Sequence, residues 1–145
     1  MPTETLDEDV DDDEIVLIAW LKDLLPEGHV ANTRKPGGPL PYYLVNHLDA
    51  NESVDESTVD TLISVHVLTH KSAGEVASLN EATTMHNRML LLARYLEDVP
   101  LPGGRTATID FVNVAMPPKR EDYGDEQILR RIARYNLGFT RAKVQ

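Results

Sequence analysis

The chain has 145 residues, of which 41% are hydrophobic, and this is enough for one domain with its own core. The absence of Cys excludes disulfide frameworks, thiolate zinc sites and cysteine nucleophiles. A net charge of −10 removes the general attraction for phosphate backbones that nucleic-acid binding needs. The apolar runs, such as Ile15–Leu21, are too short to cross a bilayer, and acids stand where a signal peptide would carry Lys or Arg.

The first segment is acidic, and a short helix follows it. Residues 1–12 offer little apolar surface, so we expect a disordered acidic arm ahead of a single domain over residues 13–145. Asp12 or Asp13 is a suitable N-cap, and Glu14 suits the positive end of a helix dipole. Apolar residues then recur at helical spacing until Pro26, which ends the helix.

The middle of the chain predicts strands. A short strand is expected within 29–34, and the loop 35–41 then leads into Tyr42–Leu48, which is rich in aromatic and β-branched residues. After an acidic connection at 49–57, Val59–Thr69 alternates with apolar residues on both faces. This pattern indicates a central strand.

A long helix follows the central strand. Ser72 and Glu75 fit a capping box, and the helix is expected to run to about Leu96. A stripe at steps of three and four residues predicts that one side packs on the sheet; it comprises Val76, Leu79, Ala82, Met85, Met89, Leu92, Ala93 and Leu96.

Two further strands are expected in the last third of the chain. Thr106–Val114 alternates, with Ile109, Phe111 and Asn113 on one face, and Met116–Gln127 has the composition of a polar loop. Ile128–Arg141 forms the last strand. Consecutive strands with no helix between them predict an α+β fold with a mostly antiparallel four- to five-stranded sheet and two helices packed on one face.

Charge of opposite sign gathers at the two ends of the chain. Residues 1–14 carry eight acids and no base, whereas residues 130–145 carry five bases and no acid. This asymmetry suggests complementary surfaces, either within one molecule or between neighbouring copies. The alternative is a solvated acidic tail beside an ordinary basic edge strand.

No pattern in the sequence predicts catalysis, a metal or a cofactor. His66 and His70 are four apart, but on a strand they lie roughly 13 Å from each other, too far to share an ion. The acids at 7–14 lack the glycine and the ligand spacing of an EF-hand. The two Gly-Gly pairs lack the context of a phosphate-binding loop, and no G-x-S-x-G motif occurs. We therefore expect a protein that is not an enzyme.

The order of the elements, together with a few short motifs, suggests a family. The first helix ends in Leu24-Leu25-Pro26, and Pro39-Leu40-Pro41 leads into a strand. The strand Thr61–Leu68 ends at Thr69-His70-Lys71-Ser72 before a long helix, and the chain closes on an Arg-led strand. Over residues 13–142 the chain resembles the tail terminator (tail-completion) proteins of long-tailed bacteriophages, although the acidic arm is longer than is usual for that family.

The resemblance implies a structural protein of the virion, located at the tail and neck and assembled in the host cytoplasm. Such proteins form a hexameric ring on the last ring of the tail tube, stop tube polymerisation, and face the head–tail connector. The implied partners are further copies of the chain, the tail tube protein and the connector protein. DNA would pass through the ring only as transient cargo, and no membrane is involved.

The long connection 116–127, the basic last strand and the acidic arm are the candidate contact elements. The residues we expect at contacts with other copies or partners are Lys119, Arg120, Glu121, Asp122, Tyr123, Arg130, Arg131, Arg134, Asp11, Asp12 and Asp13. The arginine group is alternatively a lining of the ring channel. Other functions that fit the sequence are a head–tail connector or stopper protein, a small cytoplasmic ligand-binding α+β domain, and an interaction adaptor.

Overall fold

The computed structural model describes residues 12–52 and 58–141. Within these residues, two α-helices, six strands and three single 3-10 turns follow one another. In order they are α1 (Asp12–Leu21), a 3-10 turn (Lys22–Leu24), β1 (Val30–Ala31), β2 (Tyr42–Glu52), β3 (Thr58–His70), a 3-10 turn (Lys71–Ala73), α2 (Gly74–Tyr95), β4 (Val99–Pro100), a 3-10 turn (Pro102–Gly104), β5 (Thr106–Glu121) and β6 (Ile128–Arg141).

The strands form one six-stranded sheet in the order β1-β2-β3-β6-β5-β4. All neighbouring pairs are antiparallel except β1 and β2, which are parallel. The α+β class is confirmed, but the sheet is mixed and has more strands than the four to five expected from the sequence. β1 (Val30–Ala31) lies within the short strand expected at 29–34, whereas β4 was not predicted because its two residues are too few for alternation to reveal.

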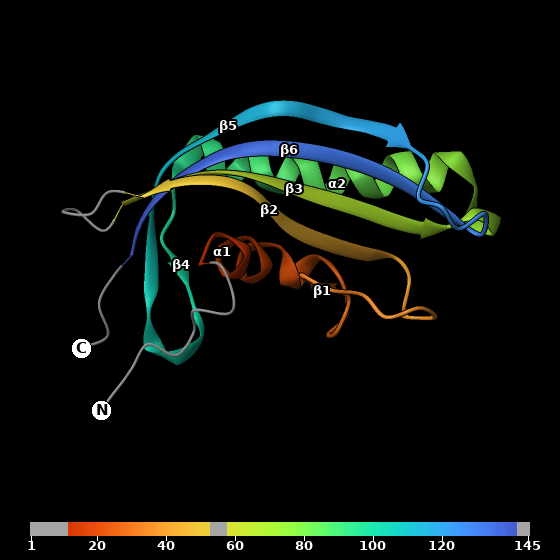
Figure 1. Cartoon of the computed structure of the whole chain (residues 1–145), viewed down its shortest axis with the longest axis horizontal. Helices are drawn as coiled ribbons and strands as arrows, with labels where there is room; N and C mark the ends of the chain where they lie inside the picture. The colour runs from red at the N-terminus through yellow and green to blue at the C-terminus, as the bar shows by residue number, and fades with distance from the viewer. Residues whose placement is uncertain (1–11, 53–57, 142–145) are drawn as a thin grey trace.

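The sheet is strongly curled, and both helices pack on its inner face (Figure 1). α1 contacts β1, β2, β3 and β4, so the two ends of the curled sheet both reach the same helix. α2 lies along the middle strands and contacts β3, β5 and β6. We call this side the covered face of the sheet, and the opposite side the outer face.

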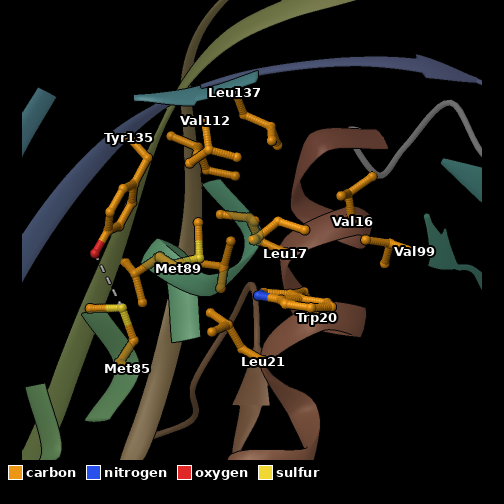
Figure 2. Packing of buried hydrophobic residues seen from close by; sticks show 14 of the residues in the cluster. Val16, Leu17, Trp20, Leu21, Met85, Met89, Val99, Val112, Tyr135 and Leu137 are labelled. Carbon is orange, nitrogen blue, oxygen red and sulfur yellow. Dashed lines mark hydrogen bonds between the residues drawn. The ribbon is translucent and has the colours of Figure 1, made fainter. Parts of the chain in front are cut away.

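The core lies between the covered face and the two helices. Figure 2 shows Leu17 and Leu21 of α1 directed toward Met89 of α2, with strand residues closing the cluster. Trp20 of α1 and Arg88 of α2 join the helices reciprocally: the indole Nε1 donates to the Arg88 carbonyl at 2.9 Å, and Arg88 Nε donates to the Trp20 carbonyl at 3.0 Å. The Arg88 guanidinium also lies 3.7 Å from the centre of the indole ring.

Alternation along β3 and β6 determines which side chains face the helices. The register pairs Ile63 with Tyr135 and Val65 with Ala133, and these four side chains are buried on the covered face. The next residues along each strand, such as His66, therefore point to the outer face. The central position predicted for this strand is confirmed.

β5 departs from the sequence prediction in length and in its faces. It continues to Glu121 through Pro117 and Pro118, because no strand pairs with its outer edge beyond Ala107 in the described residues and an edge tolerates proline. A bulge between Ile109 and Phe111 also breaks the alternation. Ile109 therefore faces the core, whereas Phe111 lies on the outer face.

α2 departs from the prediction at its start. It begins at Gly74 after the 3-10 turn, and no side chain forms its N-cap. Ser72 donates its backbone N–H to His70 Nδ1 at 3.0 Å, so the expected capping box with Glu75 does not form. Glu75 instead pairs with arginines of the sheet, and these pairs replace the cap interaction.

A buried polar cluster holds the start of α1 against the sheet. Asp13 is 2% exposed, and it accepts hydrogen bonds from the Thr61 hydroxyl and from the Glu14 backbone N–H, the latter at 2.9 Å. His47 Nδ1 lies 2.6 Å from the Asp13 carboxylate. Glu14 accepts from the backbone N–H of His47 at 2.7 Å and from Asn32 at 3.0 Å. These bonds satisfy the buried carboxylate inside the molecule.

Candidate assembly surfaces

Most of the residues expected at contacts gather at one end of the sheet, where the turn 122–127 joins β5 to β6. The register pairs Arg120 with Arg131 and Glu121 with Arg130. Because neighbours along a strand point to opposite faces, the first pair lies on the covered face and the second on the outer face. The adjacent arginines of β6 therefore do not form one basic surface.

On the covered face, Arg120 and Arg131 attach the first turn of α2 to the sheet. Arg120 Nε lies 3.2 Å from the Glu75 carboxylate, and Arg131 Nη2 lies 3.2 Å from the same group. Arg131 Nε also donates to the Ser78 hydroxyl at 3.1 Å. These two cations have intramolecular partners.

On the outer face, Arg130 is held by the turn. Its guanidinium lies 3.4 Å from the Glu121 carboxylate, donates to the Asp122 carbonyl, and lies 5.6 Å from the centre of the Tyr123 ring. Tyr123 packs against a small apolar cluster of Tyr42, Leu68 and Ile128. Lys119 and Arg134 are exposed on the same face, and neither forms an ion pair within the described part of the chain.

His66 lies on the outer face beside these cations. Burial first, and then the charge of Arg130, lowers the pKa of His66 from 6.5 to about 4. The imidazole is therefore neutral at neutral pH. Its Nε2 is 3.1 Å from the Ser64 hydroxyl and its Nδ1 is 3.5 Å from Arg130 Nη1.

A shallow depression of about 430 Å³ lies beside the same turn. Its lining combines Lys71 and Arg120 with the acidic side chains of Asp122, Asp125 and Glu126. Groups of both charge signs therefore line an open surface here, and these lining groups do not pair a nucleophile with a base.

Among the contact candidates of the first segment, Asp13 has a described side chain, and that side chain does not join this network. Asp11 lies outside the described residues, and Asp12 is described only as the first residue of α1. Asp13 is buried against Thr61 of β3. Arg131 pairs with Val67 of the same strand, six residues from Thr61. That separation is roughly 20 Å. The carboxylate of Asp13 is therefore not part of the molecular surface.

The outward side of α2 is a surface that the sequence analysis missed. Val76 and Leu79, expected to pack on the sheet, are 71% and 49% exposed. Ala82, Met85, Met89 and Leu92 of the same predicted stripe are buried, as expected. Apolar residues outside the stripe, namely Leu90, Leu91 and Tyr95, were the signal that the helix has a second apolar side.

The described residues hold no cluster of three or more side chains with the makeup of a metal site. Neither described helix has the length and apolar character of a membrane span.

The architecture is a two-layer α+β fold whose curled sheet carries both helices on its inner face. No protein-family model and no curated protein matches the chain. Among solved structures, it is similar to a chain in a structure described as the "Virion of native gene transfer agent (GTA) particle". The two chains share 14% identity with a TM-score of 0.50, over 86% of this chain and 84% of that one. A likeness at this identity shows a common fold.

Proposed function

We propose that this protein is a structural component of a virion, and specifically a tail terminator that forms a hexameric ring on the end of a phage-type tail tube. The observation that carries the proposal is the fold shared with a chain of a gene transfer agent virion over most of both chains. The order of elements that resembles tail terminators agrees with it. The ring would join the tube to the head–tail connector.

The surfaces of the molecule are consistent with assembly rather than catalysis. Three buried polar groups of the core have partners: Asp13 contacts Thr61, Tyr43 donates to Glu81 at 2.6 Å, and the Tyr135 hydroxyl lies 2.6 Å from His86 Nδ1. Burial raises the pKa of Tyr43 and of Tyr135, so both phenols stay protonated. We therefore propose a role without enzymatic activity.

The proposal is tested by mixing the purified chain with the tail tube protein of the same virus-like particle. Electron microscopy of the tubes is expected to show one ring with sixfold symmetry at a single tube end. Tubes formed in the presence of the protein should also stop elongating, because the ring accepts the tube on one side only.

Two results would contradict the terminator assignment. Decoration along the whole tube would indicate a different tail protein. Binding to the connector without binding to the tube would favour the alternative of a connector or stopper protein. Native mass spectrometry of the mixed sample separates these outcomes, because it reports which partner each oligomer contains.

A further inference from the structure

The outward side of α2 lacks the charges that normally solvate a helix. From Val76 to Tyr95 it presents ten exposed positions, of which only Arg94 is charged, in a chain with 26% charged residues. Five of the ten are large and apolar: Val76, Leu79, Leu90, Leu91 and Tyr95. An exposed apolar surface of this kind marks an interaction site.

The absence of acid on this surface favours a second copy of the same chain as the occupant. Two copies that each carry a net charge of −10 repel one another. Their repulsion is least where the contacting surface is poor in acid, as α2 is between Glu75 and Glu97, where Glu81 is the single acid. Glu81 is half-buried and accepts a hydrogen bond from Tyr43, so it is turned toward the sheet.

The outer face of the sheet is the complementary surface. No described helix covers it, and Leu62, Phe111 and Met116 are partly exposed there. The ring of Phe111 lies against Gly138, where a Cβ atom would stand 2.1 Å from the nearest ring carbon. On the outward side of α2, a hollow of about 270 Å³ is lined by Asn87, Leu90, Leu91 and Arg94. Side chains of a bare sheet face can fill such a hollow.

Charge fixes the direction of the contact. The exposed acids Glu97 and Asp98 follow α2, whereas the exposed cations Lys119 and Arg134 lie on the outer face, and none of the four has an ion-pair partner among the described residues. Leu91 is roughly 10 Å from those acids along the helix and the residues after it. Gly138, beneath Phe111, is roughly 13 Å from Arg134 along β6. The apolar and charged groups are thus separated by a similar distance on both surfaces. When the acids of one copy lie opposite the cations of the next, the apolar residues of the two surfaces therefore also come into contact.

We propose that the outward side of α2 of one copy packs on the outer sheet face of the next copy, with Glu97 and Asp98 opposite Lys119 and Arg134. The two surfaces lie on opposite sides of the subunit, so the contact is heterologous and repeats until a ring closes. This inference rests on the proposed function, because it names the interface from which the ring is built.

Site-specific cross-linking tests the pairing directly, because the natural chain has no cysteine. Leu91→Cys marks α2, and Asn113→Cys marks the exposed outer face, where Asn113 pairs with Asn136. A short bismaleimide is expected to join the two single variants when they are mixed, and to convert the double variant into a ladder that ends at the closed ring. The matched control Lys35→Cys, in the exposed loop before β2, should not join to Leu91→Cys.

Charge reversal tests the direction of packing. Sedimentation of Glu97→Lys/Asp98→Lys, and separately of Lys119→Glu/Arg134→Glu, is expected to show at least threefold weaker association than the natural chain. An equal mixture of the two variants should recover most of the loss, because each then presents one reversed surface to the other. A merely structural effect of either pair of substitutions would not be rescued by mixing.

The outcomes separate this inference from the proposed function. If Leu91→Cys joins to itself as readily as to Asn113→Cys, the contact is isologous and the inference is wrong. The absence of any cross-link, both in solution and on tube ends that the protein caps, would also overturn it while leaving the terminator function intact. Cross-linked rings that never bind tubes would support the interface and contradict the proposed function.

Discussion

The two faces of the sheet differ in the kinds of side chains they carry and in how far those side chains are buried. The covered face meets two helices, and its side chains, such as Ile63 and Tyr135, are completely buried. The outer face has partly exposed apolar residues, a neutral histidine and two cations without described partners. The difference indicates that the covered face supplies the stability of the fold and that the outer face is available for contacts.

The largest effect is expected at Leu17 of α1, which is completely buried in the core under the covered face. Leu17→Ala is expected to lower the free energy of unfolding by about 3 kcal/mol, through lost burial and the cavity left behind. Leu62→Ala on the outer face is the matched control, with an expected loss of about 1 kcal/mol. Urea denaturation measures both, and equal losses would show that the two faces do not differ as described.

Asp13 tests the polar part of the covered face. Asp13→Ala removes the acceptor of the Thr61 hydroxyl and the carboxylate beside His47, and we expect a loss of about 2 kcal/mol. Asp23→Ala, at an exposed acid in the following 3-10 turn, should change the stability by less than about 0.5 kcal/mol. Thermal unfolding followed by circular dichroism compares the two, and similar melting temperatures would contradict a structural role for Asp13.

Gly138 tests the outer face by steric means. Gly138→Ala places a methyl group where the Phe111 ring lies, and the expected loss is about 1 to 2 kcal/mol as the ring moves away. In Gly138→Ala/Phe111→Leu the clash is relieved, so the two losses should not be additive. Additive losses in a double-mutant cycle would mean that the ring and Gly138 act independently.

His66 gives the smallest expected effect, and it depends on pH. Its pKa is lower in the folded chain than the ordinary value of 6.5, so the unfolded chain binds the proton more readily between pH 6.5 and about 4. Stability should therefore fall as the pH decreases through that window, by on the order of 1 kcal/mol, because partial exposure screens the effect of the arginines. His66→Gln should lack this pH-dependent part of the stability. Urea denaturation of both proteins across the window measures it, and parallel profiles of stability against pH would exclude a contribution from His66.

The sequence predicted those elements whose own residues set the pattern. Ile128–Arg141 alternates without interruption and was predicted with correct bounds, and the central strand was predicted to within one residue at each end. Alternation also places Arg130 and Arg131 on opposite faces, although the sequence interpretation treated Arg130, Arg131 and Arg134 as one group. The class of fold followed from the order of these elements.

The errors arose where tertiary contacts override the local pattern. Proline at 117 and 118 suggested a loop, yet an edge strand accommodates both residues. The bulge after Ile109 could not be read from alternation, so Phe111 was assigned to the wrong face. Val76 matches the spacing of the buried stripe, but it is 71% exposed, and the buried residue of that turn is Ser78. The burial of Asp13 depends on Thr61, which is distant in sequence.

The free edge of β5 limits how copies of this chain can meet. Beyond Ala107 no described strand pairs with that edge, and an unpaired edge normally recruits further strands and leads to fibrils. Three register shifts distort this strand, and the pair Pro117-Pro118 lacks amide donors. Backbone-directed strand addition at this edge is thereby obstructed, which favours contacts through side chains over pairing of strands here.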